Sequence, residues 1–297
     1  MVALLILSPL ALSFLLLPYF KWRREHSLPL EQTVEKSSLP SNRKSVRLSI
    51  IIPAFNETLR LPAMMNEAIS YLSDRRNQEP KFDWEIIVVD DHSSDATFDL
   101  GTSFNTEATP VYAIRLRKNS GKGGAVRVGV LHAMGDQILM VDADGATRFS
   151  DLENLEKAYD PSTGVDVVFG SRHKLEHSEA VQKRHPFRNL LMYGFHMSVV
   201  LIIGTHIKDT QCGFKLFSKM AGKILFQSLH LQRWAFDTEI VLLCKLLNFK
   251  VAEVDVTWTE IEGSKLNPAV AAVQMLRDMV LVRLLYVLNV WKPTVTM

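Results

Sequence analysis

The chain has 297 residues, of which 47% are hydrophobic and 22% are charged. This is enough apolar material for the core of one large domain or two small ones, and a formal net charge of +2 is too small to indicate a nucleic-acid-binding protein. Two cysteines, Cys212 and Cys244, form neither a disulfide framework nor a paired metal site, so we expect reduced thiols in a reducing compartment.

The N-terminus predicts a membrane anchor. Residues 1–20 carry no charged side chain and are rich in Leu, and Lys21, Arg23 and Arg24 follow at once. An apolar helix of about 20 residues spans the hydrocarbon core, whereas a cleaved signal peptide has its positive charge before a shorter apolar run. Because positive charge favours the cytoplasmic side, we expect the rest of the chain in the cytosol, where the sequon at Asn56 stays unglycosylated.

Residues 21–46 are polar and contain Pro29 and Pro40, which predicts a linker. Short apolar runs then alternate with segments of helical character at residues 61–72 and 123–134. Such alternation predicts an α/β domain with a mostly parallel sheet covered by helices on both faces. The predicted strands are residues 48–52, 84–89, 111–116, 137–141 and 166–169.

Polar clusters follow the predicted strands, where parallel sheets bind ligands. The strongest is Asp142-Ala143-Asp144. Two carboxylates one residue apart repel each other unless a positive charge lies between them, and a divalent cation that bridges a diphosphate supplies that charge. A helix cap or a surface turn is the alternative interpretation of this motif.

Two further clusters favour a nucleotide site. An apolar strand ends at Pro53 and is followed by Phe55, Asn56 and Glu57, which suits the floor of such a site or the start of a helix. Asp90 and Asp91 follow the next predicted strand, where a carboxylate is able to accept the N–H of a uracil ring. Capping of the next helix explains Ser94 and Asp95 but not the two aspartates before them.

A glycine-rich segment around Lys122 enters a predicted helix, a place that favours an anion. It lacks the P-loop spacing, because Leu116 occupies the first glycine position and Gly123 follows the lysine. It also departs from the dinucleotide fingerprint, since Val126 occupies the third glycine position. ATP hydrolysis and NAD binding are therefore disfavoured.

Seven motifs in order resemble those of the family 2 glycosyltransferases with the GT-A fold, and among them the eukaryotic enzymes that glucosylate dolichyl phosphate. They are residues 51–57, 90–95, 118–125, 140–146, 170–172, 210–215 and 236–239. The resemblance implies a Rossmann-like GT-A domain over residues 47–260, UDP-glucose as donor, dolichyl phosphate as acceptor, Mg²⁺ or Mn²⁺ as cofactor, and the endoplasmic reticulum membrane. Related mannose synthases often carry a metal-contacting Gln where this chain has Ala146.

The resemblance also implies inversion by one in-line displacement, with Asp142 and Asp144 holding the metal ion. We expect Arg172 to bind the acceptor phosphate, since Arg binds phosphate in a bidentate manner, with Arg184 and Arg188 as helpers or as a basic membrane-facing surface. Asp237 and Glu239 are expected to position sugar hydroxyls or to act as a weak base. Pro53, Phe55, Asn56, Glu57, Asp90, Asp91, Lys122 and Asp142 are the predicted donor-binding residues.

The apolar segments 190–203 and 270–291 are either core helices or interfacial helices. For a lipid acceptor we favour interfacial helices, with residues 261–297 as a membrane-associated C-terminal segment. GDP-mannose as donor, a soluble acceptor, and a non-catalytic membrane scaffold of the same fold remain alternatives.

Overall fold

The structure is a computed structural model that describes residues 30–160, 162–172, 207–261 and 268–294, together with residues 13, 16, 17, 19, 197, 199, 200 and 202–204. Most of the predicted transmembrane segment 1–20 and of the segment 190–203 lies outside the described residues, as do Arg184 and Arg188. None of the helices described has both the length and the hydropathy needed to cross a bilayer.

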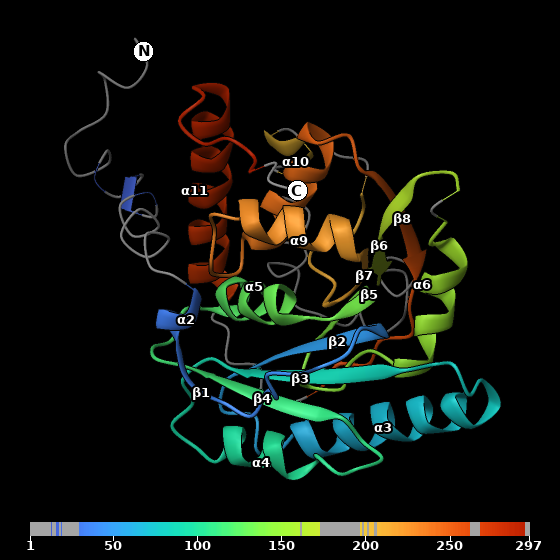
Figure 1. The fold of residues 1–297 in the computed structure, drawn as a ribbon. Helices are drawn as coiled ribbons and strands as arrows, with labels where there is room; N and C mark the ends of the chain where they lie inside the picture. Colours follow the sequence, from blue (N-terminus) through green and yellow to red (C-terminus); the bar gives the residue numbers. More distant parts are fainter. Residues whose placement is uncertain are drawn as a thin grey trace.

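One sheet of eight strands forms the centre of the molecule, in the order β1-β4-β3-β2-β5-β7-β6-β8 (Figure 1). The strands β2 to β5 pair in parallel, whereas β7 pairs antiparallel with both β5 and β6. The strands are β1 (Val34–Ser37), β2 (Val46–Ala54), β3 (Trp84–Asp90), β4 (Val111–Leu116), β5 (Gly135–Val141), β6 (Val165–Ser171), β7 (Phe214–Ser218) and β8 (Lys250–Asp255). The five predicted strands are confirmed; β1, β7 and β8 were not predicted.

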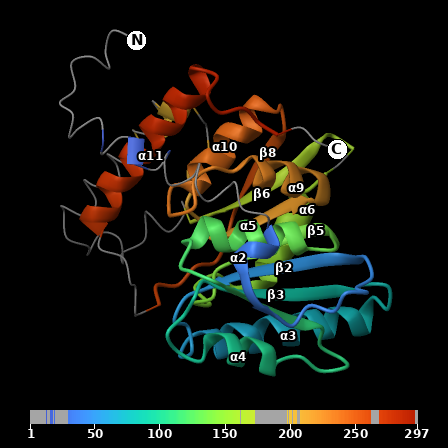
Figure 2. The ribbon, with the colours of Figure 1, turned by 60° about the vertical axis from the view of Figure 1, so that its left-hand side comes forward.

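Helices cover both faces of the sheet, as its apolar strands require. In β2, Ile50 and Ile52 pack into one buried cluster and Ile51 into another, because successive side chains of a strand point to opposite faces. The first cluster includes residues of α3 (Leu61–Gln78) and α6 (Leu152–Ala158), with α4 (Thr97–Ser103) beside it. The second includes residues of α5 (Lys122–His132), α9 (Lys219–Ser228), α10 (Phe236–Leu246) and α11 (Pro268–Val287), and Figure 2 shows α11 on this side.

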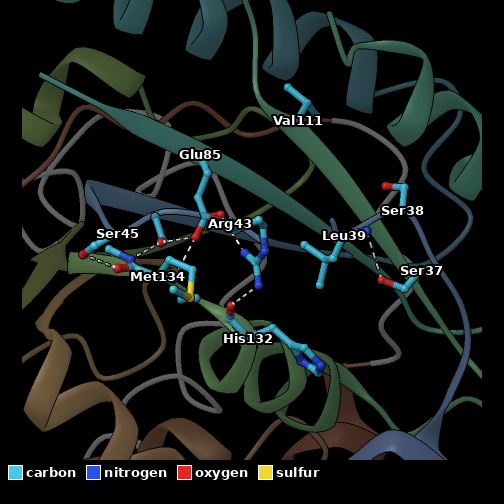
Figure 3. A network of polar contacts seen from close by, with 12 residues as sticks. Ser37, Ser38, Leu39, Arg43, Ser45, Glu85, Val111, His132 and Met134 are labelled. Atoms are coloured by element: carbon cyan, nitrogen blue, oxygen red, sulfur yellow. Dashed lines mark hydrogen bonds and ion pairs between the residues drawn. The ribbon is translucent and has the colours of Figure 1, made fainter. Parts of the chain in front are cut away.

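The segment before β2 belongs to the fold, so the predicted linker over residues 21–46 is too long at its C-terminal end. The edge strand β1 pairs antiparallel with β4. Arg43 then donates from Nη1 to Oε2 of Glu85 at 2.7 Å and from Nη2 to the carbonyl of His132 at 2.7 Å (Figure 3). These contacts fasten the segment across β3 and the end of α5, because a buried carboxylate needs a charged or hydrogen-bonding partner.

The carboxyl ends of the parallel strands meet at a point where the strand order reverses. From β2 the chain continues to β3 and β4 on one side, and β5 then pairs on the other side of β2. Ligands of open α/β sheets bind at such a switch point. Because β7 is antiparallel and Phe214 pairs with Val141, residues that precede β7 reach the same edge.

Candidate active site

The carboxylate pair lies at the end of β5, as predicted. Asp144 accepts the N–H of Ala146 at 3.0 Å across a turn in which Gly145 has a φ of 72°. Burial raises the pKa of Asp144, and the negative charge of Asp142 raises it further. The fold therefore keeps the two carboxylates close together although they repel each other. A cation between them would reduce this repulsion.

Lys122, the first residue of α5, forms an ion pair with one carboxylate of this pair. Its Nζ lies 2.6 Å from Oδ1 of Asp142. Burial lowers the pKa of Lys122, but the carboxylates of Asp142 and Asp237 outweigh burial, and the net effect raises it. The ammonium also lies 6.0 Å from the ring of Trp234, a half-exposed side chain. Lys122 was predicted as a donor-binding residue, and the structure joins it to the carboxylate pair.

Arg60 contributes positive charge that the sequence analysis missed. Its guanidinium donates to both carboxylate oxygens of Glu57, at 2.7 and 2.5 Å, just before α3. The hydrogen bond to Glu57 raises the pKa of Arg60 against the effect of burial, and the charges of Asp144 and Asp142 raise it further. An arginine three residues after a glutamate is an ordinary helix-surface pair, so nothing in the sequence alone marked it.

Asp90 and Asp91, at the end of β3, already have protein partners. Asp90 is fully buried; it accepts from the N–H of Ser93 at 3.0 Å and pairs with Arg115 at 3.2 Å. Asp91 accepts the N–H groups of Ser120 at 2.6 Å and Gly121 at 2.8 Å. Their predicted contact with a uracil ring stays a prediction.

The sequence predicts an anion at the glycine-rich start of α5. In the structure, the carboxylate of Asp91 occupies this position. Burial raises the pKa of Asp91 to about 6, although the two N–H groups oppose the shift. The glycines serve close packing instead: a β-carbon at Gly121, whose φ is 88°, would lie 2.7 Å from the carbonyl oxygen of Gln232, and one at Gly123 would lie 2.6 Å from Cβ of Phe236.

The segment that follows β2 is bonded to the segment that follows β3 at the same edge of the sheet. Pro53 lies within β2, opposite Val89, and Phe55 is partly exposed. Asn56 has a φ of 55° and accepts the N–H of Ser94 at 2.8 Å through Oδ1. The predicted donor-binding segments after β2 and β3 are therefore bonded directly to each other at the switch point.

Arg172, at the end of β6, forms a forked ion pair. It donates from Nε to Oδ2 of Asp209 at 2.7 Å and from Nη2 to Oδ1 at 2.9 Å. Burial lowers the pKa of the guanidinium, but the carboxylate of Asp209 outweighs burial, and the net effect raises it. The third nitrogen, Nη1, lies outside the fork, and Trp258 lies 5.6 Å from the guanidinium. The predicted binding of the acceptor phosphate would therefore use the edge of the guanidinium that carries Nη1.

The structure separates the two acidic residues of α10. Asp237 pairs with Lys215 at 2.6 Å, and burial raises its pKa against the charges of Lys215 and Lys122. Glu239 is fully buried and faces His230 and Tyr286, at 2.7 and 3.0 Å. Asp237 interacts with the charges of Lys122 and Asp142. The expected role of Asp237 and Glu239 in positioning sugar hydroxyls or as a weak base stays a prediction.

The donor set fits a divalent metal ion. Asp142 and Asp144 supply carboxylate oxygens, which Mg²⁺ prefers together with water and phosphate oxygens. Burial and the charge of Asp142 raise the pKa of Asp144, and a cation between the two carboxylates would favour their charged forms. Within the described residues, no group of three or more His, Cys, Asp or Glu side chains is placed to hold a metal ion. Diphosphate and water oxygens are ligands that would suit the remaining positions of the metal shell.

Several characterised proteins resemble this chain in sequence. Residues 49–225 match the family described as Glycosyl transferase family 2. A Homo sapiens protein named dolichyl-phosphate beta-glucosyltransferase is 42% identical over 284 residues, which are 93% of this chain and 87% of that one. The proteins of the same name from Dictyostelium discoideum and Saccharomyces cerevisiae are 45% and 38% identical, each over 84% of this chain and over 77% and 78% of their own lengths.

Solved structures share the fold. Glucosyl-3-phosphoglycerate synthase from Mycobacterium tuberculosis, in complex with phosphoglyceric acid, superimposes with a TM-score of 0.54 at 18% identity over 80% of both chains. The same enzyme in complex with Mn²⁺ and UDP-glucose gives a TM-score of 0.53 at 18% identity, over 80% of this chain and 79% of that one. The mixed sheet flanked by helices is therefore a GT-A-like architecture. Because the family match spans more than half of the chain and the relatives align over most of their lengths, the chain belongs to glycosyl transferase family 2.

Proposed function

We propose that this enzyme transfers glucose from UDP-glucose to dolichyl phosphate with inversion, giving dolichyl beta-D-glucosyl phosphate, a lipid-linked glucose donor for the assembly of N-glycan precursors. The observation that carries the proposal is the identity of 38–45% to relatives named dolichyl-phosphate beta-glucosyltransferase. The carboxylate pair at the switch point of the sheet, with Lys122 beside it, supports it chemically.

The reaction is an in-line displacement in which an oxygen of the acceptor phosphate attacks the anomeric carbon and UDP leaves from the opposite face. A phosphate monoester is largely dianionic near neutral pH, because its second pKa is about 6. The enzyme therefore needs little general-base help. Its main tasks are to orient two anions and to neutralise the leaving diphosphate.

Asp142 and Asp144 would hold a divalent ion, Mg²⁺ or Mn²⁺, which when bound neutralises charge on the diphosphate. Support for this assignment comes from the raised pKa of Asp144 and, by analogy, from the Mycobacterium tuberculosis enzyme solved with Mn²⁺ and UDP-glucose. Lys122 and Arg60 add fixed positive charge around the same carboxylates. Nη1 of Arg172 is the group proposed to bind the acceptor phosphate.

The acceptor is a lipid, so the enzyme is proposed to lie on a membrane. The helix α11 presents an outer stripe of exposed aliphatic side chains, which suits an interfacial helix. Residues 1–20 are proposed to anchor the chain in the endoplasmic reticulum membrane, with the domain in the cytosol. The exposed residues of the stripe are Val273, Leu276, Val280 and Val287, and Leu288 and Val290 continue it beyond the helix.

Two experiments test these proposals. The purified full chain is incubated with dolichyl phosphate, Mn²⁺ and labelled UDP-glucose or GDP-mannose. Transfer from GDP-mannose alone would replace UDP-glucose as the proposed donor, and no transfer from either would favour a non-catalytic scaffold.

The second experiment tests the topology: protease is added to sealed microsomes. Digestion of most of the chain is expected, whereas a protected domain or a glycan on Asn56 would reverse the topology.

A further inference from the structure

A buried polar cluster connects the C-terminal helix to the loop that precedes α10. Glu239 accepts the backbone N–H groups of His230 and Leu231, the closest at 2.7 Å. It also accepts from Nδ1 of His230 at 2.7 Å and from the hydroxyl of Tyr286 at 3.0 Å. The indole of Trp291 stacks on the imidazole of His230 at 4.0 Å between centroids and 10° between planes.

The loop held by this cluster packs directly on the start of α5. The carbonyl of Gln232 accepts the N–H of Gly124 at 2.9 Å. Gly121 and Gly123 lie so close to Gln232 and Phe236 that neither has room for a β-carbon. The position of the first turn of α5 is therefore set by the loop over residues 230–236.

Lys122 is part of that first turn, and its ammonium pairs with Asp142 at 2.6 Å. Described contacts thus run without a break from Tyr286 on α11, through Glu239 and the loop, to the carboxylate pair. We infer that His230, Glu239 and Tyr286 form a latch that connects α11 to the loop and thereby positions Lys122 in the donor site. This inference rests on the proposed function, because it assigns the latch to the binding of the UDP donor.

The chemistry of the latch favours positioning over simple packing. An apolar side chain at position 239 would anchor α11 without the cost of removing a carboxylate from water, and buried ionic groups often add little net stability. Glu239 instead takes hydrogen bonds from two backbone N–H groups and two side chains. Such directional bonds fix the position of the loop, which non-directional apolar contacts do less well. The latch residues are therefore positioning residues, which act on the donor through Lys122.

The test measures UDP binding to the full chain in detergent with Mn²⁺ by titration calorimetry. Tyr286→Phe removes one hydroxyl from the latch and keeps the ring. Tyr71→Phe is the matched control, since Tyr71 also donates to a carboxylate, Glu153, at 3.3 Å, but on the exposed side of α3. We expect about a fivefold loss of UDP affinity for Tyr286→Phe, in line with one hydrogen bond, and less than a twofold change for the control.

A double-mutant cycle then decides whether Tyr286 acts through Lys122. In a Lys122→Ala background, Tyr286→Phe should have no further effect on UDP affinity. Equal losses in both backgrounds, or a lower melting temperature with unchanged UDP affinity, would make the latch a structural feature only and overturn the inference. If the unaltered chain binds no UDP, the proposed donor fails together with the inference, whereas normal binding with no response to Tyr286→Phe defeats the inference alone.

Discussion

Gly213 lies directly against the carboxylate of Asp142, so that a β-carbon built on this glycine would overlap Cγ and both carboxylate oxygens. The contact arises because Phe214, the first residue of the antiparallel strand β7, pairs with Val141 at the end of β5. Gly213 therefore sets where one of the two proposed metal ligands can sit.

Gly213→Ala should lower the rate of glucosyl transfer at least tenfold, because either Asp142 or the backbone must move. Gly222→Ala is the control: its β-carbon would lie 3.1 Å from Cδ1 of Ile138, the end of a flexible side chain. Transfer assays and thermal unfolding of both variants make the comparison. A fully active Gly213→Ala variant would show that the position of Asp142 is not critical.

Asp144→Ala should reduce transfer about 100-fold or more, the scale expected when a group that stabilises transition-state charge is lost. The melting temperature without metal should not fall, because burial and Asp142 already disfavour the charged form of Asp144. Asp136→Ala, at an exposed carboxylate, controls for loss of charge. Near-normal turnover of Asp144→Ala in a buffer with a chelator would argue against a metal role.

Arg172→Ala should raise the Michaelis constant for dolichyl phosphate and lower turnover while UDP-glucose binding stays nearly unchanged. Loss of a charged hydrogen bond costs roughly 1.5–3 kcal/mol, or about one to two powers of ten in the specificity constant for the acceptor. Arg172→Lys should retain partial function, since it keeps the charge but loses the planar fork. Weakened donor binding of equal size would place Arg172 in the donor site.

Asp209→Asn tests the support of Arg172 separately. Asp209 holds Nε and Nη2 of the guanidinium, so the amide should leave Nη1 poorly oriented and raise the acceptor Michaelis constant. The change also destabilises the fold, by less than the roughly 3–5 kcal/mol of a fully buried pair, because the Arg172 side chain is partly exposed. Urea unfolding is therefore measured beside the kinetics. Unchanged acceptor kinetics in the folded fraction would mean that the fork does not orient Arg172 for the acceptor.

The pH dependence of the free energy of unfolding should show the titration of Asp91. Its folded-state pKa of about 6 lies above the ordinary value of 3.8, so between these values the folded chain keeps a proton that the unfolded chain releases. Stability should therefore fall as the pH rises through this window. The shift corresponds to about 3 kcal/mol.

Asp91→Asn cannot titrate, so the free energy of unfolding of the unaltered chain minus that of the variant should decrease between pH 4 and 6 and then level off. Urea unfolding at several pH values measures this difference, and Asp136→Asn, at an exposed carboxylate, is the control. A difference that is constant with pH would show that Asp91 titrates normally.

The local pattern of the sequence is enough to predict five strands and the polar clusters that follow them. Continuous apolar runs such as residues 84–89 are strands buried on both faces, and a parallel sheet brings their carboxyl ends together. For this reason the sequence alone predicts that Asp90, Asp91, Asp142 and Asp144 lie at one edge of the sheet, as the structure has them. Local periodicity did not reveal β1, β7 or β8. These segments are short, and they are strands because they pair with neighbouring strands of the sheet.

Only the tertiary structure decided which charged groups meet. Lys122 is 20 positions from Asp142 in sequence, and Asp209 is 37 positions from Arg172, yet each pair is in contact. Asp237 and Glu239 look like one motif, but two residues along a helix turn the side chains about 200° apart, toward Lys215 and toward His230. The sequence determines which residue types are available, whereas strand order and helix rotation determine which of them become partners. The reason is that side-chain interactions act over a few ångströms of space and not along the chain.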